Sequence, residues 1–271
     1  MLNSIQRERK VSDMLDRESK NAFARLGCEY QSVAIKFCYA KPEGVEKAEE
    51  VMSFCQFVKL CQDTGKTFCI GKDNDNCFGK MVLGMIPKQP FAASGQAGMD
   101  FGVYRTPAPN ARIHSQIPTM VQGSVNYVLF STVENCDFEP DLVIVVADVE
   151  QADIVMRATS YISGDFWESK TSCVMSCGWT YVYPYMTGKV NFCVTGMHHG
   201  MARRKVYPKG LHIIAIPYQK LDEVCTALKE MPWKLPALQD DEESRAIMAA
   251  RMAKWEEMQA QSGGEIPPAE V

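Results

Sequence analysis

The alternation of hydrophobic and polar residues predicts short strands and amphipathic helices along most of the chain. Apolar residues recur at helical intervals over residues 11–28 and again over residues 45–61. Two short runs rich in β-branched and aromatic residues, SVAIKF (32–37) and KTFCIG (66–71), predict strands. Residues 87–118 are rich in Pro, Gly and Ala, which predicts a loop that lies on the surface or covers a cleft.

A pattern in the second half of the chain occurs twice, over about residues 123–160 and 188–230. The first copy begins GSVNYVLFS and continues DLVIVVADVEQADIVMRA. The second begins GKVNFCVTG and continues GLHIIAIPYQKLDEVCTAL. Each reads as strand, connection, strand and helix, so we predict an α+β fold with a mixed sheet, flanking helices and an internal duplication of a β-loop-β-α unit. The alternative is that similar sheet chemistry arose twice.

The character of the sequence changes after Trp233. We therefore predict a single α+β domain over residues 1–235, followed by a charged C-terminal helix and a frayed tail over residues 236–271. The predicted helix is amphipathic, and its apolar stripe consists of Ile247, Met248, Met252 and Trp255. Such a helix packs on its own domain, on a second copy of the chain or on a partner subunit.

Composition and charge narrow the class of protein. Hydrophobic residues make up 46% and charged residues 23%, which is ordinary for a globular chain. A formal net charge of −4 argues against nucleic acid or an anionic membrane as the partner. The charged N-terminus lacks the apolar segment of a signal peptide, and the longest aliphatic run, Leu142–Ala147, is too short for a membrane span. These features predict a cytoplasmic protein.

The 11 cysteines are more than such a protein needs. In a reducing compartment they are core residues, metal ligands or redox groups rather than a disulfide framework. Cys77 lies in a turn, where packing does not demand cysteine, and Cys177 precedes a glycine. Cys193 occupies the second-copy position that is Val128 in the first copy, while Cys55 has the helical spacing of a core thiol. Together Cys55, Cys77, Cys177 and Cys193 supply the four thiolates that an iron–sulfur cluster or a zinc ion requires.

Residues 176–200 contain five aromatic residues but a single charged side chain, Lys189. We interpret this segment as a buried sheet that also lines a ligand cavity, with Tyr181 and Tyr183 in its wall. His198 and His199 follow; one of them is predicted to contact a ligand, and the alternative is a solvated hairpin.

A basic turn comes directly afterwards. Arg203 and Arg204 are absent from the corresponding connection of the first copy, which is acidic. Arginines bind carboxylate or phosphate by paired hydrogen bonds, so we predict that at least one guanidinium points into the cavity and anchors an anionic ligand. A solvated basic turn is the alternative.

Several segments together are similar to a known family. They are FCQFVKL, NCFGKMVLGM, FEPDLVIVVADVEQADIVM, CGWTYVYPYMTGKVNF and GLHIIAIP. Their order resembles domain-of-unknown-function family 169 (DUF169), an uncharacterised cysteine-rich family of archaea and mostly anaerobic bacteria, over roughly residues 30–220. The resemblance implies a role in anaerobic metabolism and favours Cys55 as a functional residue, because cysteine tends to follow the phenylalanine of that helix in the family.

Three functional hypotheses follow. The first is a cytosolic redox or metal-associated protein, an oxidoreductase or redox accessory protein, with an iron–sulfur cluster, zinc or another thiolate-bound metal near a small-molecule cavity. The second is a non-catalytic accessory protein that binds an aromatic or tetrapyrrole-like cofactor or substrate. The third is an interaction subunit that uses the C-terminal helix to form a homo-oligomer or to bind a partner.

Overall fold

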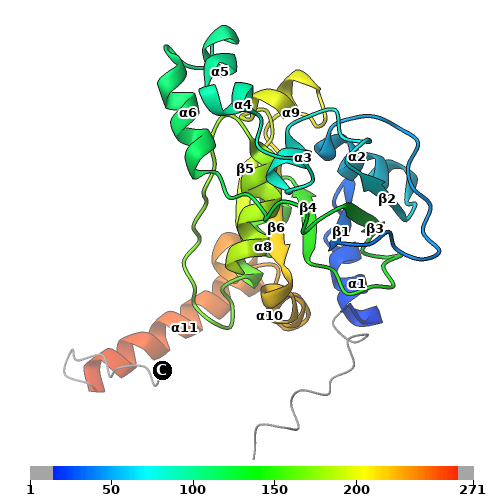
Figure 1. Ribbon diagram of the computed structural model, residues 1–271. Helices are drawn as coiled ribbons and strands as arrows, with labels where there is room; N and C mark the ends of the chain where they lie inside the picture. The colour runs from blue at the N-terminus through cyan, green and yellow to red at the C-terminus, as the bar shows by residue number, and fades with distance from the viewer. Residues whose placement is uncertain (1–14, 262–271) are drawn as a thin grey trace, which may run out of the picture. The chain divides into compact units, whose positions relative to one another are not determined.

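A six-stranded sheet forms the centre of the fold in the computed structural model, which describes residues 15–261 (Figure 1). The strand order is β2-β3-β1-β4-β6-β5, and every neighbouring pair is antiparallel. The predicted α+β class is confirmed, whereas the sheet is antiparallel and not mixed. The strands are β1 (Tyr30–Cys38), β2 (Phe68–Gly71), β3 (Tyr127–Thr132), β4 (Leu142–Ala147), β5 (Asn191–Val194) and β6 (His212–Pro217).

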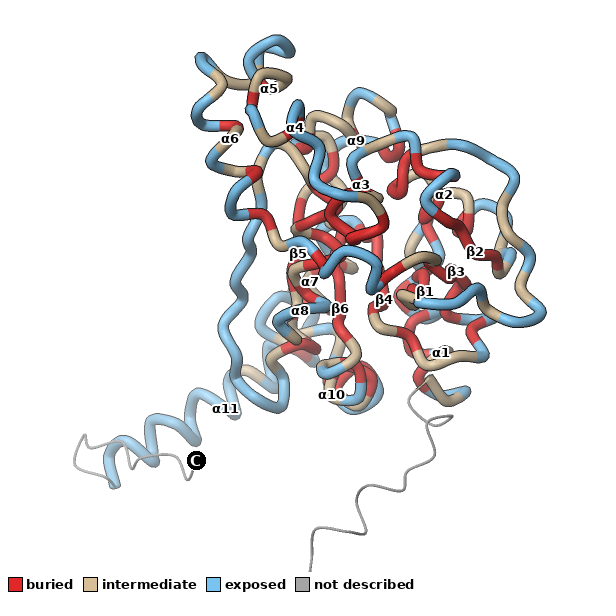
Figure 2. The backbone as a smooth tube through the Cα atoms, viewed as in Figure 1, coloured by how far each residue is buried: buried red, intermediate tan, exposed pale blue. Residues whose placement is uncertain are grey.

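Both faces of the sheet are covered, as the sequence of β4 already requires. Its six residues, LVIVVA, are all buried (Figure 2), which is typical of a strand packed on two sides. Leu142 and Ile144 belong to the main hydrophobic cluster, and alternation turns Val143 and Val145 to the other face. Helices α7 (Val149–Ala158) and α10 (Tyr218–Glu230) contact β4 and β6.

Helix α2 (Phe54–Thr64) packs against β1 and β3. It starts at Ser53, whose side chain forms a capping box with Gln56, and ends at Gly65 with a left-handed φ of 67°. The helix predicted over residues 45–61 is therefore too long at its N-terminal end. Residues 45–53 form no helix: Lys47 and Met52 make isolated β-bridges to Cys69 and Asp75, and the Asn74 side chain donates to the carbonyls of Ala48 and Glu50 at 2.8 and 2.9 Å.

The two predicted copies have similar orders of elements, β3-β4-α7 and β5-α9-β6-α10, and differ by the short helix α9 in the second connection. If each copy formed one unit, its two strands would be adjacent in the sheet. The strands of the second copy do pair with each other, whereas in the first copy β1 lies between β3 and β4. The duplication itself stays a prediction of the sequence.

The segment predicted as a loop contains three short helices instead: α4 (Pro90–Ser94), α5 (Gln96–Asp100) and α6 (Pro107–Gln116). Proline occupies the first turn of α4 and α6, where its missing N–H costs nothing. Gly95, at φ +78°, ends α4 in the left-handed conformation, and a Cβ there would lie 2.1 Å from the carbonyl oxygen of Pro107. In this segment the prolines therefore begin helices, and Gly95 ends one helix and allows another to pack closely against it.

The predicted buried sheet over residues 176–200 is also mostly helical. Only β5 is a strand, and it follows a π-helix, η3 (Gly178–Val182), and α8 (Tyr183–Thr187). The remaining helices within residues 15–230 are α1 (Arg17–Arg25), α3 (Gly79–Val82) and α9 (His199–Arg203).

The chain divides into two units between Glu230 and Met231. The second unit contains a short 3-10 helix, η4 (Pro236–Leu238), and α11 (Glu242–Gln261), which lies where the sequence predicts the charged helix. The frayed tail predicted after α11 falls outside the described residues. Over residues 15–261, no helix is long and apolar enough to cross a membrane.

Candidate functional site

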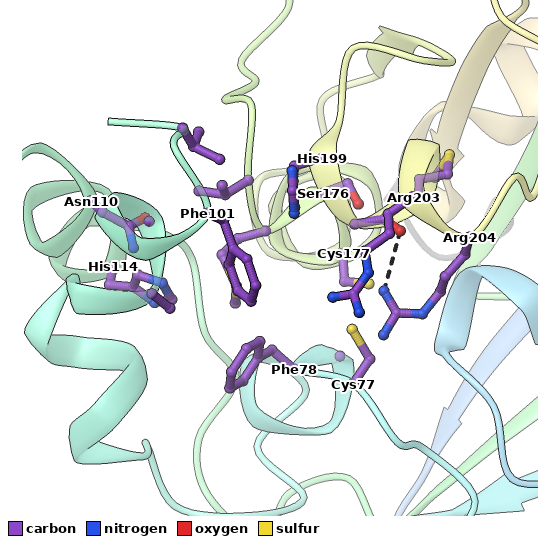
Figure 3. Close-up of a pocket in the computed structure, with 18 of the residues that line it drawn as sticks. Cys77, Phe78, Phe101, Asn110, His114, Ser176, Cys177, His199, Arg203 and Arg204 are labelled. Atoms are coloured by element: carbon purple, nitrogen blue, oxygen red, sulfur yellow. Dashed lines mark hydrogen bonds between the residues drawn. The ribbon is translucent and has the colours of Figure 1, made fainter. Parts of the chain in front are cut away.

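A cavity of about 290 Å³ opens on the first unit, and its walls come from segments far apart in the sequence (Figure 3). Helices α5 and α6 form one side, the turn before α3 forms another, and α9 with the segment before η3 completes it. The lining is mainly apolar. Its polar and thiol residues are Cys55, Cys77, Asn110, His114, Ser176, Cys177, His199, Arg203 and Arg204.

A buried carboxylate fixes the turn that carries Cys77. Asp75 accepts hydrogen bonds from the backbone N–H groups of Cys77 at 2.7 Å and Lys80 at 2.6 Å. Burial raises the pKa of Asp75 to about 6, although both hydrogen bonds favour the charged form. Gly79 is required beside it, because a Cβ at that position would lie 2.5 Å from Asp75 Oδ2. The half-buried Cys77 thiol is thus held at the cavity by a rigid turn.

Two buried thiols line the cavity with Cys77. Cys55 follows the first residue of α2, with its sulfur 3.2 Å from Ser53 Oγ, and Cys177 directly precedes η3. Burial raises the pKa of the Cys55 thiol to about 11. Burial also raises the pKa of Cys177 well above its usual range, and the neighbouring Cys55 and Cys77 raise it further. Three of the four cysteines predicted as ligands therefore meet at one cavity.

The fourth, Cys193, lies elsewhere. It is buried on β5, its sulfur is 3.7 Å from Thr180 Oγ1, and it does not line the cavity. Within residues 15–261, no group of three or more His, Cys, Asp or Glu side chains is arranged to hold one metal ion. A metal or cluster stays a prediction of the sequence.

Both arginines of the predicted basic turn line the cavity. In Figure 3 their guanidinium groups lie beside the side chains of Cys77 and Cys177. Arg204 Nη1 donates to the Gly200 carbonyl at 3.2 Å, and the Arg203 guanidinium lies 5.8 Å from the centroid of the Phe101 ring. Neither arginine forms an ion pair with a carboxylate of the described residues, although the positive charge of Arg204 favours the ionised form of the buried Asp75 carboxyl.

Of the two adjacent histidines, His199 lines the cavity and His198 does not. The His199 ring stacks on Phe101 with centroids 5.5 Å apart, and its buried Nε2 has no hydrogen-bond partner among the described residues. His198 Nε2 lies 2.6 Å from Thr171 Oγ1, and burial lowers the pKa of His198. His199 and not His198 therefore lines the same cavity as the two arginines. The sequence alone did not decide which histidine would do so.

Neither tyrosine predicted in the cavity wall lines it. Tyr181 is buried in the main hydrophobic cluster, with its ring 4.5 Å from that of Phe54. Tyr183 lies under the Lys170 ammonium, 5.5 Å from its ring centroid. The aromatic lining comes from Phe78, Phe91 and Phe101 instead.

Sequence reasoning missed Asn110 and His114, which lie one turn apart on α6. Asn110 Nδ2 donates to the Gly95 carbonyl at 3.1 Å, while its buried Oδ1 has no partner among the described residues. The buried Nδ1 of His114 has none either, and burial lowers the pKa of this histidine. Their spacing of four residues was the available signal, but it predicts a shared face only in a helix.

Backbone geometry also marks this wall as unusual. Met175, which lines the cavity, has a φ of 59°, a conformation that costs a non-glycine residue about 1–2 kcal/mol. The π-helix η3 begins three residues later. Strained residues and π-helical turns occur preferentially at functional sites, so both features favour a functional cavity.

Comparison with known proteins identifies the family and nothing narrower. The chain belongs to DUF169, described as uncharacterised ArCR, whose family model matches residues 24–227. This match confirms the resemblance found in the sequence. No curated protein and no solved structure matches the chain.

Proposed function

We propose that this protein binds a compact anionic small molecule in the cavity, with Arg203 and Arg204 as its anchor. The observation that supports this proposal is a pair of guanidinium groups that line a mainly apolar cavity and form no ion pair with a carboxylate of the described residues. The buried Asp75 carboxyl interacts with Arg204 through longer-range charge only. Two like charges placed together are unfavourable alone, and a bound carboxylate or phosphate offsets that repulsion.

The lining suggests the size and character of the ligand. Ligand pockets usually measure about 300–1,000 Å³, so a cavity of about 290 Å³ suits a molecule of one or two rings. Phe78 and Phe101 offer an apolar surface for its body. A charge-assisted hydrogen bond sheltered from water contributes about 1.5–3 kcal/mol, against about 1 kcal/mol or less for an exposed pair.

Benzoate and inorganic phosphate are suitable probes, and isothermal titration calorimetry measures their binding. We expect benzoate to bind more tightly than phosphate, because it adds apolar contact to the charge. Arg204→Ala should weaken benzoate binding by about tenfold, which corresponds to about 1.4 kcal/mol. Arg203→Ala should weaken it by less, because Arg203 is more exposed than Arg204. The lysine variants should also bind weakly, because an ammonium lacks the planar fork of an arginine.

Arg112→Ala is the matched control, because Arg112 is exposed on α6 and does not line the cavity. Its benzoate affinity and melting temperature should equal those of the wild type. The proposal fails if the wild type binds neither probe, or if the Arg203 and Arg204 variants bind benzoate as the control does.

A second candidate is the redox or metal-associated function predicted from the sequence. The observation that favours it is separate from the arginines: Cys55, Cys77 and Cys177 come from three distant segments and line the same cavity. A protein of this kind would use the thiols to hold a cofactor and the arginines to hold an anion next to it.

A further inference from the structure

We propose that Cys55, Cys77 and Cys177 are a three-cysteine ligand set for a four-iron iron–sulfur cluster, bound in the cavity next to Arg203 and Arg204. This inference rests on the second candidate function and does not require the anionic small molecule. Cys55 comes from the start of α2, Cys77 from the turn before α3 and Cys177 from the segment before η3. Cys55 and Cys177 also belong to the main hydrophobic cluster, so packing accounts for their burial, whereas the half-buried Cys77 lies outside that cluster.

The arrangement suits a cluster better than a single ion. A zinc ion binds each sulfur at about 2.3 Å, so its ligands must crowd around one point. The described residues contain no group of three His, Cys, Asp or Glu side chains arranged in that way. A cluster is several atoms wide and is held by cysteine thiolates farther apart. It also needs empty volume beside them, which the cavity of about 290 Å³ supplies.

The structure reduces the ligand set from four cysteines to three. Cys193 lies on β5 against Thr180 and outside the cavity lining, so it cannot serve as the fourth ligand. Three cysteines leave one iron of a four-iron cluster without a cysteine ligand. That iron could take a ligand from outside the chain, which is a requirement for chemistry at a cluster rather than electron transfer alone.

Charge supports the same assignment. A four-iron cluster with three thiolates is an anion in its common oxidation states, and buried charge requires compensation. Arg203 and Arg204 provide two cations at the cavity, and neither forms an ion pair with a carboxylate of residues 15–261, although Arg204 also interacts at longer range with the buried Asp75 carboxyl. Nearby charge and hydrogen bonds to sulfur are also the means by which proteins adjust cluster potentials.

Anaerobic reconstitution of the full chain with ferric iron, sulfide and a thiol reductant, which reduces part of the iron to the ferrous state, tests this inference. Iron and sulfide per chain are measured together with visible absorption and the electron paramagnetic resonance spectrum of the reduced protein. We expect about four iron and four sulfide per wild-type chain, as a four-iron cluster requires. Cys55→Ser, Cys77→Ser and Cys177→Ser should each lose most of both and lose the spectrum of the wild type.

Cys193→Ser and Cys225→Ser are matched controls, because both cysteines are buried and lie outside the cavity lining. They should keep the wild-type iron and sulfide content. Urea unfolding identifies any variant that loses iron and sulfide because it does not fold. Wild-type protein without iron and sulfide, or ligand variants that retain as much as the folded controls, would overturn the inference. Benzoate binding to the iron-free protein decides the first proposal separately.

Discussion

Replacing Gly178 by alanine tests how the cavity wall is packed. Gly178 is the first residue of η3, directly after Cys177. An added Cβ would lie 2.4 Å from both Cγ1 and Cδ1 of Ile117, a buried residue just past the end of α6. Contacts that short cannot exist, so either Ile117 leaves its place or the π-helix shifts.

The magnitude follows from two known effects. Overpacking a core by one methyl group costs about 1–3 kcal/mol, and we expect about 2 kcal/mol for Gly178→Ala. Ile117→Ala removes both clashing atoms and costs about 2–5 kcal/mol by leaving a cavity. In the double variant the methyl group added by Gly178→Ala occupies part of that cavity. The cost of the double variant should therefore fall below the sum of the single costs by about 1–2 kcal/mol, as for residues in direct contact.

Urea unfolding, followed by circular dichroism, measures all three variants against the wild type. Gly200→Ala is the control, because Gly200 lies in α9 and its Cβ would be 3.5 Å from the nearest atom outside the helix backbone, Arg204 Nη1. Alanine is favoured over glycine inside a helix by about 1 kcal/mol, so this variant should be at least as stable as the wild type. Additive costs for Gly178→Ala and Ile117→Ala would refute the packing described for this wall.

Two further predictions concern other parts of the first unit. Asn74→Ala removes three side-chain hydrogen bonds of a buried residue, so it should lower the free energy of unfolding by about 2–4 kcal/mol. Asn76→Ala is the control, because it removes one hydrogen bond of an exposed residue and should change the free energy of unfolding little. Equal costs for the two variants would contradict the role given to Asn74. Burial raises the pKa of Asp141 above 3.8 despite its bond from the Phe37 N–H, so the folded chain holds this proton at pH values where the unfolded chain has lost it. The contribution of Asp141 to stability should therefore decline as the pH rises from 3.8 through the raised pKa. Asp141→Asn should remove this part of the pH dependence of urea unfolding, and an unchanged pH dependence would show that the group has no such role.

The sequence predicts the strands well because each is a short apolar run, and a short run of this kind is typical of a buried strand. β4 and β6 are such runs. It fails over residues 178–187, where the aromatic and β-branched sequence WTYVYPYMT predicts a strand but the chain is helical. β-propensity measures how a side chain fits its neighbours in a sheet more than a preference of the backbone. Tyr181 finds its neighbour on α2 instead, where its ring lies 4.5 Å from that of Phe54.

At the candidate site, sequence identifies residue types but not which of them meet. Cys77, Arg203 and Arg204 follow from chemistry that packing does not explain, and all three line the cavity. Cys193 carries a thiol as Cys77 does, but from its position on β5 this thiol contacts Thr180 and does not reach the cavity. Asn110 and His114 escape notice because prolines and glycines hide the helix that carries them. Which distant segments meet at the cavity depends on the tertiary structure, and the spacing of residues along the chain does not show it.

The position of β1 has a consequence for how this protein is made. β1 is synthesised well before both of its partners in the sheet, because β3 and β4 lie beyond residue 126. Until they are synthesised, an apolar strand has two free edges, and such a strand readily pairs with other chains. Productive folding therefore depends on protecting this segment during translation, and slow synthesis between residues 38 and 127 should favour aggregation over the native sheet.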